Sequence, residues 1–358
     1  MSRVPLDAGI QRILVVNFGG IGDELLFFPV IQSLREAYPS SRITALVEPR
    51  CQGIMAFNPA VDEVLTLEVK ARRSVGEFLR TVLELRKRRF DLAIASGRSP
   101  VMPLMLLMAG ARFRVGYDAS RLAWTLTERV PLNSQQYAGQ MYYDLVRPWI
   151  GIPFRLPQVA LQAADREWAR AFLGEHGVSA DEPLVVFHPG TSQVALRKGI
   201  IKTWEPSRWA ELARRLSAQG TRLVLAGGPD DGEAVAAIQQ HLEVPMIVAH
   251  GKTRSLGQMA ALLAEASVLV SVDSAPLHLG VAVGTPTVAI FGPTDPSKLL
   301  PGGTPHQAVH VSQLSCRPCL WDRRSTSCES LSCLTDLGVD PVEQAVWRVL
   351  PTRNAHGL

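Results

Sequence analysis

The chain has 358 residues, of which 47% are apolar and 20% are charged, and its formal net charge at pH 7 is +4. A chain of this length and apolar content can bury more than one hydrophobic core, so we expect two domains. No stretch approaches the roughly 18 apolar residues that cross a bilayer, and the first residues lack the apolar segment of a secretory signal. We therefore expect a cytoplasmic protein, whose five cysteines stay reduced or bind metal.

Positive charge is concentrated in the first half of the chain. Residues 1–155 carry 20 Lys and Arg against 14 Asp and Glu, whereas residues 156–358 carry 17 against 19. The densest basic run, residues 71–90, has helical spacing and includes Arg72 and Arg73. Such a helix could bind an anionic acceptor or a membrane surface, or it could simply be a solvated face. Nucleic acid is not an expected partner, because aromatic residues make up only 6% and no zinc-finger spacing occurs.

Apolar segments alternate with helical patterns along the whole chain. In the first half the predicted strands are residues 13–17, 43–47 and 92–95, and the predicted helices are residues 25–37 and 71–90. After a proline-rich crossing at residues 151–157 and a helix at 165–176, the alternation resumes, with predicted strands 184–187, 222–226, 246–249 and 268–272 and predicted helices 209–218 and 255–264. Strands separated by helices indicate parallel sheets of the doubly wound α/β class.

We therefore expect two Rossmann-like domains, residues 1–160 and 161–335, that face a central cleft, followed by a helix and tail at 336–358. Ligands of such sheets collect at the carboxyl ends of the strands, so the cleft between the two domains is expected to hold the chemistry. A final helix is expected at residues 341–350, and the first domain is its candidate packing partner.

The first strand runs into a glycine loop, NFGGIGDELL, with Gly19, Gly20 and Gly22 before a helix that is expected to begin near Asp23. A dinucleotide-binding fingerprint needs glycine at position 25, which is Leu25, so a dehydrogenase is disfavoured. The positive end of a helix favours the charged form of a carboxylate. Asp23 therefore suits a general base that accepts a proton from a sugar hydroxyl, and the alternative is a plain helix cap.

Polar residues follow two strands of the second half. The segment HPGTSQVALRKGIIKTWEP places Thr191 and Ser192 at a strand end, and Lys202 could stabilise a leaving diphosphate, with Lys198 as a competitor. The turn AGGPDD follows the next strand, and Asp231 could accept ribose hydroxyls there. The alternative for that turn is a glycine turn without a binding role.

Residues 270–296 read as strand, acidic turn, short helix, strand and a second phosphate-binding loop, which contains Thr294. Asp273 and Ser274 are residue types that cap helices, and the positive end of the helix that follows suits a diphosphate, with His278 on the first turn. The alternative is an ordinary capped helix inside a βαβ unit.

Four cysteines in a polar loop have the spacing C-x2-C-x8-C-x4-C: Cys316, Cys319, Cys328 and Cys333. Four thiolates this close in sequence fit a tetrahedral zinc or iron site with a structural role, since no ligand position stays open. The alternative is a set of free buried thiols or disulfides.

Five motifs in this order, GGIGD, HPGTS with K-x-W-x-P, GGPDD, VDSAPLH and FGPTDP, resemble glycosyltransferase family 9, the lipopolysaccharide heptosyltransferases, over residues 12–345. The resemblance implies a GT-B fold, ADP-heptose as donor, inversion at the anomeric carbon and no required cofactor. It also implies an acceptor in the phosphorylated, lipid-linked inner core, held by the basic first domain, and peripheral contact with the inner face of the inner membrane.

The resemblance also assigns roles to single residues. Asp23 becomes the base and Lys202 the diphosphate contact, while Asp231 replaces a ribose-binding glutamate of some members. The expected donor-binding residues are Thr191, Ser192, Asp231, Asp273, Ser274, Ala275, Leu277, His278 and Thr294, with backbone N–H groups of the turn at 273–278 holding the diphosphate. The expected acceptor-binding residues are Gly20, Gly22, Arg72 and Arg73.

Three alternatives remain open at this point. The acceptor could be a protein hydroxyl, since autotransporter heptosyltransferases bind iron through a comparable cysteine group. The donor could be another nucleotide sugar. A non-catalytic nucleotide-sugar-binding protein would keep the fold without turnover, although the presence of Asp23 and Asp273 argues against it.

Overall fold

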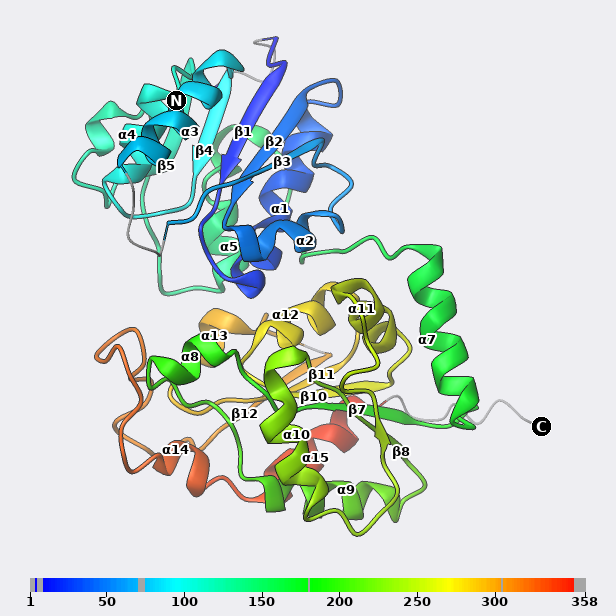
Figure 1. Cartoon of the computed structure of the whole chain (residues 1–358). Coiled ribbons are helices and arrows are strands. Elements are labelled where there is room, and N and C mark those ends of the chain that lie inside the picture. Colours follow the sequence, from blue (N-terminus) through cyan, green and yellow to red (C-terminus); the bar gives the residue numbers. More distant parts are fainter. Residues whose placement is uncertain (1–3, 5–8, 70–74, 180, 304, 351–358) are drawn as a thin grey trace. The chain divides into compact units, whose positions relative to one another are not determined.

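The chain divides into two compact units, Met1–Ala160 and Leu161–Leu358, in a computed structural model (Figure 1). The structure describes residues 4, 9–69, 75–179, 181–303 and 305–350. Within these residues each unit contains a six-stranded sheet whose strands are all parallel. No helix of this part of the chain has both the length and the apolar character needed to cross a membrane.

The first sheet has the strand order β3-β2-β1-β4-β5-β6, which is the order of doubly wound dinucleotide-binding folds. Its central strands are apolar and buried, as expected for a sheet covered on both faces. The strands are β1 (Arg12–Val16), β2 (Arg42–Val47), β3 (Glu63–Thr66), β4 (Leu92–Ala95), β5 (Phe113–Tyr117) and β6 (Glu128–Val130).

The helices of the first unit form two groups. Helix α1 packs against α2, α5 and α6, whereas α4 packs against α3, η2, β4 and β5 (Figure 1). The basic run forms α3, which ends at Lys87 and not at residue 90, because Arg89 takes up a left-handed backbone conformation with φ of 51°. The helices are α1 (Ile21–Ala37), η1 (Pro49–Cys51), α2 (Gln52–Met55), α3 (Val75–Lys87), α4 (Val101–Met108), η2 (Ala123–Thr125), α5 (Ala138–Tyr143) and α6 (Arg147–Ile150).

The second sheet has the order β12-β11-β10-β7-β8-β9, so it repeats the topology of the first. The centre is formed by fully buried strands, and its edge strand β9 is only two residues long. The strands are β7 (Leu184–His188), β8 (Arg222–Leu225), β9 (Ile247–Val248), β10 (Val268–Val272), β11 (Thr287–Ile290) and β12 (His306–Val309).

Helices α9, α10 and α15 pack together in the second unit, while α7, α11 and α12 form another group (Figure 1). The final helix, α15, buries Val342, Ala345 and Val346 in the core of this unit, together with β11 and β12. The apolar stripe of α15 is therefore used within the second unit, and the expected packing against the first domain stays a prediction. The helices are α7 (Ala163–Glu175), α8 (Gln193–Arg197), α9 (Pro206–Ser217), η3 (Pro229–Asp231), α10 (Gly232–Gln239), α11 (Leu256–Ala264), α12 (Ala275–Ala282), α13 (Pro296–Leu299), α14 (Ser332–Thr335) and α15 (Val339–Val349).

Candidate functional site

The glycine loop lies at the carboxyl edge of the first sheet, between β1 and α1. Helix α1 begins at Ile21, so Asp23 is its third residue and not its cap. The Asp23 carboxylate folds back over the loop, where its Oδ2 accepts a hydrogen bond of 2.7 Å from the Gly20 N–H. A side chain at position 19 would place its Cβ 2.2 Å from the Cβ of Asp23, so this turn requires Gly19. Asp23 is therefore held in place and only partly buried.

Three side chains near Asp23 do not appear in the sequence prediction. The Tyr142 hydroxyl lies 3.5 Å from Asp23 Oδ1, and its pKa is raised by burial and then by the charge of Asp23, so the phenol remains a donor. Glu24 is fully buried, and burial and then the Asp23 charge raise its pKa well above the ordinary value, which favours the neutral acid. The guanidinium of Arg50 donates to the Gly19 carbonyl at 3.2 Å. A signal for Arg50 exists, because it follows β2 closely at the same sheet edge.

In the second unit, the Asp273 carboxylate is hydrogen-bonded to the Lys202 ammonium and the Thr294 hydroxyl. It follows β10 directly, and its Oδ2 accepts hydrogen bonds from Lys202 Nζ at 3.0 Å and from Thr294 Oγ1 at 2.8 Å. Burial alone would raise the pKa of Asp273, but the charges of Lys202 and His278, together with these hydrogen bonds, hold that pKa below its ordinary value. The exposed fractions of the Asp273 and Lys202 side chains are only 5% and 14%, so the ion pair is largely shielded from water. Lys198, the competitor of Lys202, is exposed at the end of α8.

The Asp231 side chain is buried in the turn after β8, and its carboxylate is hydrogen-bonded there. Its Oδ2 accepts a hydrogen bond of 2.7 Å from Gly228 N–H and lies 3.2 Å from Nε2 of buried His188. Its Oδ1 packs against Gly190, where a Cβ would lie 1.8 Å away. Nδ1 of His188 lies 3.5 Å from Ser274 Oγ, so His188 connects the turn after β8 to the turn after β10. His188 was missed by the sequence reasoning, although its place as the last residue of β7 was a signal.

Thr191 and Asp231 together line a cavity of about 260 Å³ beside α10. Thr191 is buried, whereas the Ser192 hydroxyl caps α8 by accepting a hydrogen bond of 3.3 Å from the Ala195 N–H. The cavity is also lined by Trp204. The structure therefore brings the HPGTS and GGPDD motifs together.

The turn before α12 offers fewer backbone donors than the sequence predicted. Ser274 is the residue before the helix and Pro276 lies in its first turn. The Leu277 N–H, an expected diphosphate donor, instead donates to the Ser274 carbonyl at 3.1 Å. The remaining expected donors are the N–H groups of Ser274 and Ala275, beside the Asp273–Lys202 pair.

Comparison with known proteins identifies the family. Residues 78–329 match the family model described as glycosyltransferase family 9 (heptosyltransferase). The chain belongs to glycosyltransferase family 9. Lipopolysaccharide heptosyltransferase 3 of Escherichia coli is 26% identical over 284 residues, which cover 76% of this chain and 81% of the relative. This membership excludes the dehydrogenase alternative.

Solved structures show the same fold. A glycosyltransferase of family 9 from Veillonella parvula has a TM-score of 0.80 at 24% identity, covering 97% of this chain and 98% of its own. A heptosyltransferase of Escherichia coli, solved with ADP-2-deoxy-2-fluoro heptose, has a TM-score of 0.66 at 22% identity, covering 94% and 99%. The predicted GT-B fold of two doubly wound domains is thus confirmed, and the central cleft stays a prediction.

The cysteine-rich loop of this family 9 glycosyltransferase makes hydrogen bonds to the chain segments near Asp273. Arg317 donates to the backbone carbonyls of Gly292 and Thr294, the latter at 3.1 Å. Ser327 accepts a hydrogen bond of 2.7 Å from Ile201 N–H and donates through its own N–H to Gly199 at 2.8 Å. The loop therefore fastens the segment that precedes Lys202 and the segment that contains Thr294, which both meet at Asp273.

The four cysteines of this loop do not form a metal site in the part of the chain that the structure describes. No group of three or more His, Cys, Asp or Glu there could hold a metal ion, and the cysteines are free thiols. Burial raises the pKa of Cys319 and raises the pKa of Cys333 to about 11, whereas hydrogen bonds from the Ser330 side chain and the Leu331 backbone lower the pKa of Cys328. The prediction of a zinc or iron site through Cys316, Cys319, Cys328 and Cys333 is therefore not supported, and hydrogen bonds hold the loop.

The other predicted site residues fall into three places. Gly20 and Gly22 lie in the glycine loop and the first turn of α1. Thr294, Asp273, Lys202 and His278 form one cluster in the second unit. Arg72 and Arg73 lie outside the described residues.

The Ser327 hydroxyl accepts from Ile201 N–H and donates to the Ile201 carbonyl, and both hydrogen bonds are partly buried. We expect Ser327→Ala to lower kcat/KM by about two- to tenfold, since a hydrogen bond contributes about 1 kcal/mol and 1.4 kcal/mol corresponds to a factor of ten. Without this hydroxyl, Lys202 should be displaced, and the loss should then lie in the KM for the donor. Steady-state kinetics at varied donor concentration would show whether it does. Ser325→Ala, an exposed change on the same loop, is the matched control. Equal kinetics for both variants would contradict a positioning role for Ser327.

Proposed function

We propose that this glycosyltransferase transfers heptose from ADP-heptose to a hydroxyl of an anionic, lipid-linked lipopolysaccharide core oligosaccharide in the cytoplasm. The observation that carries the proposal is the shielded Lys202–Asp273 pair at the start of α12. The curated relative above is a lipopolysaccharide heptosyltransferase, and a solved relative was crystallised with an ADP-heptose analogue, which supports the substrates.

The second unit offers the chemistry that a departing diphosphate needs. The N-terminus of α12 carries partial positive charge, and the Lys202 ammonium, which is paired with Asp273, lies beside it. As the bond between the sugar and ADP breaks, negative charge grows on the β-phosphate, so fixed positive groups stabilise the transition state more than the ground state. Lys202 and the N–H groups of Ser274 and Ala275 are the proposed contacts. No metal is required in this proposal.

Asp23 is the proposed general base. In the reaction, the acceptor hydroxyl loses its proton to the Asp23 carboxylate while its oxygen attacks the anomeric carbon from the side opposite ADP. ADP leaves with the electrons of the broken bond, so the configuration at that carbon is inverted. The hydrogen bond from Gly20 N–H holds Oδ2, and the Tyr142 hydroxyl lies 3.5 Å from Oδ1, the other carboxylate oxygen.

Positive charge in the first unit supports an anionic acceptor. Arg50 donates to the Gly19 carbonyl of the glycine loop and also pairs with Glu48 at 3.0 Å, and Gly20 and Gly22 of that loop are proposed acceptor contacts. Arg72 and Arg73 are further proposed acceptor contacts, given the basic run that contains them. Guanidinium groups suit phosphate because they donate in a planar fork.

Calorimetry with ADP, ADP-heptose, UDP and UDP-GlcNAc tests the donor assignment on the purified protein. We expect ADP and ADP-heptose to bind at least tenfold more tightly than the uridine nucleotides, a difference of about 1.4 kcal/mol. A preference for the uridine nucleotides would overturn the donor. If ADP-heptose binds, transfer to core oligosaccharide, followed by mass spectrometry, tests the acceptor. Heptose found only on co-expressed protein would overturn that acceptor.

A further inference from the structure

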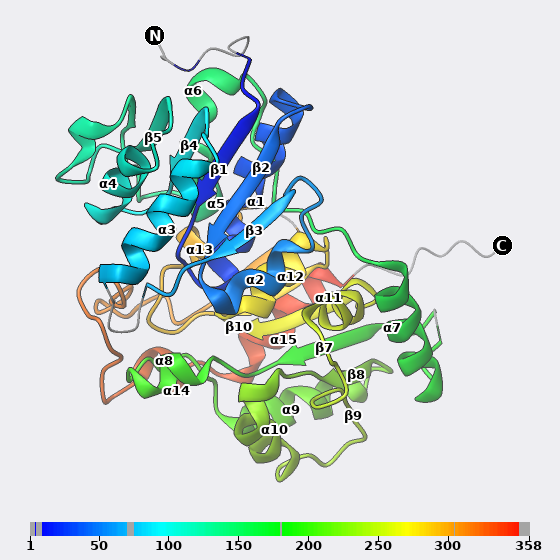
Figure 2. The ribbon, with the colours of Figure 1, turned by 45° about the horizontal axis from the view of Figure 1, so that its top comes forward.

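A buried histidine lies between two turns of the second unit. His188 is the last residue of β7, the strand that pairs with β10 at the centre of the sheet (Figure 2). Its Nε2 lies 3.2 Å from Oδ2 of Asp231, and its Nδ1 lies 3.5 Å from Oγ of Ser274. A carboxylate only accepts hydrogen bonds, so we assign the hydrogen of a neutral ring to Nε2, which leaves Nδ1 to accept from the Ser274 hydroxyl. Asp231 therefore orients the ring, and the ring holds the hydroxyl.

Ser274 precedes α12 but its hydroxyl does not cap that helix. Among the described helices of the second unit, three follow a serine, and the hydroxyls of Ser192 and Ser255 cap α8 and α11 by accepting hydrogen bonds of 3.3 and 3.1 Å from the third helical N–H. Ser255 and Ser274 have nearly the same backbone conformation, with φ of −148° and −152°. The Ser274 oxygen instead lies beside His188 and 3.3 Å from the Val272 carbonyl. The difference between these caps therefore lies in the contacts of the side chain.

We propose that His188 is a positioning residue for the donor diphosphate, because it keeps the Ser274 hydroxyl from capping α12. A capping oxygen would use one free N–H of the helix end and would stand in front of the others. With the hydroxyl held at His188, the N–H groups of Ser274 and Ala275 stay open beside Lys202. This role rests on the proposed function, in which those groups bind the diphosphate.

The Ser274 hydroxyl depends on both of its contacts. At 3.5 and 3.3 Å, each is longer than an ordinary hydrogen bond of a hydroxyl, so Val272 alone should not hold the group in place. Without Nδ1, the hydroxyl oxygen can accept from the Leu277 N–H, the third of the helix. That N–H donates to the Ser274 carbonyl at 3.1 Å, and one N–H is commonly shared between two acceptors at helix ends. Loss of His188 should therefore cap α12 and weaken diphosphate binding.

Calorimetry with ADP on His188→Gln and His188→Asn separates the two ring contacts. The longer Gln amide can reach the place of Nε2 and keep the contact with Asp231, whereas the shorter Asn amide lies where Nδ1 was, beside Ser274. We expect the Gln variant to bind ADP about three- to tenfold more weakly, the range that one hydrogen bond sets, and the Asn variant to lose less. Chemical denaturation should rank their stabilities the other way, because the Asn variant leaves Asp231 with the Gly228 N–H alone.

Ser274→Ala added to His188→Gln tests the capping itself. The N–H of residue 274 remains, but no hydroxyl is left to cap α12. ADP affinity should therefore return to within about twofold of the wild-type value, as expected for two side chains that act through one contact. If the histidine only maintained the fold, the second substitution would not restore binding.

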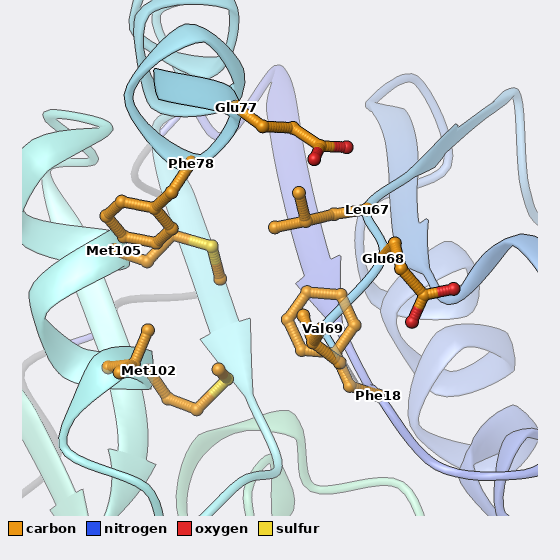
Figure 3. A pocket seen from close by; sticks show the side chains of 9 residues that line it. Phe18, Leu67, Glu68, Val69, Glu77, Phe78, Met102 and Met105 are labelled. Atoms are coloured by element: carbon orange, nitrogen blue, oxygen red, sulfur yellow. The ribbon is translucent and has the colours of Figure 1, made fainter. Parts of the chain in front are cut away.

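Met105→Ala is the matched control for a loss of stability. Met105 is fully buried and lines an apolar pocket of the first unit together with Phe78 and Leu67 (Figure 3). Its truncation should destabilise the protein, as large-to-small changes in a core do, without changing ADP affinity. A fall in ADP affinity in this variant as large as in His188→Gln would mean that binding merely follows stability, which contradicts the role of His188.

Three further results would overturn this role of His188. They are wild-type ADP affinity in His188→Gln, weaker ADP binding by His188→Asn than by His188→Gln, and affinity that stays low after Ser274→Ala. A preference of wild-type protein for UDP would overturn the proposed donor alone. The same variants would then be compared with UDP, because His188 acts on the diphosphate and not on the base. Wild-type protein that binds neither nucleotide would contradict both the donor and the role of His188.

Discussion

We expect Asp23→Asn to lower kcat by about 10²- to 10⁴-fold, the usual contribution of general base catalysis. The amide is isosteric with the carboxylate, and its oxygen can still accept the hydrogen bond from Gly20 N–H, so the loop should keep its shape. Because Asp23 belongs to the first unit and the proposed diphosphate contacts to the second, donor affinity should change little. Single-turnover kinetics with saturating donor measure the rate, and calorimetry with ADP-heptose measures the affinity.

Glu24→Gln is the control for this variant, because it removes the neighbouring carboxyl without touching Asp23. Glu24 is fully buried and its raised pKa favours the neutral acid, so an amide should replace it with only a small change in turnover. If Asp23→Asn keeps more than about a tenth of wild-type kcat, Asp23 is not the base. Loss of turnover in Glu24→Gln alone would move the role to Glu24.

The sequence predicted most of the inner strands and the edge strand β9, and it missed β3, β5, β6 and β12. Strands β1, β4, β7 and β10 are apolar and fully buried beyond their first residue, so their pattern identifies them. Strand β3 is the segment EVLT and β6 is ERV, and both form only because a longer neighbour supplies hydrogen bonds. That partnership is not a local property, so local patterns could not indicate these strands.

The sequence was sufficient to predict which site residues follow strands, but it did not predict which side chains contact one another. Parallel strands bring Asp23, Thr191 and Asp273 to the carboxyl edges of their sheets, and this follows from the alternation alone. The alternation of strands and helices does not predict which groups contact the Asp231 carboxylate. The sequence suggested ribose hydroxyls, which stays a prediction, and the structure adds that Oδ2 accepts a hydrogen bond from Gly228 N–H and lies near Nε2 of buried His188. Which side chains meet at an edge depends on rotamers and loop paths, and these come from packing.

Because Lys202 pairs with Asp273, we expect a large effect of Lys202→Met on both protein stability and donor binding. Lys202→Met should leave the Asp273 carboxylate buried beside an apolar side chain, which destabilises the protein by about 3 kcal/mol. The same change should weaken ADP-heptose binding and lower kcat/KM by about 10²- to 10³-fold, as loss of one charge-stabilising group does. Chemical denaturation measures the first effect, and calorimetry with kinetics measures the second. Lys198→Met, an exposed change nearby, should resemble wild-type protein in all three measurements.

The double variant Lys202→Met, Asp273→Asn separates the two roles of Lys202. With no buried charge left to neutralise, its free energy of unfolding should return to within about 1 kcal/mol of the wild-type value. Thr294 can still donate to the new amide oxygen, so the turn before α12 should keep its form. Donor affinity and transfer should nevertheless stay low, because the cation that we propose to contact the leaving diphosphate is absent. Recovery of both in the double variant would mean that Lys202 only balances Asp273, and the diphosphate would then depend on the α12 N-terminus alone.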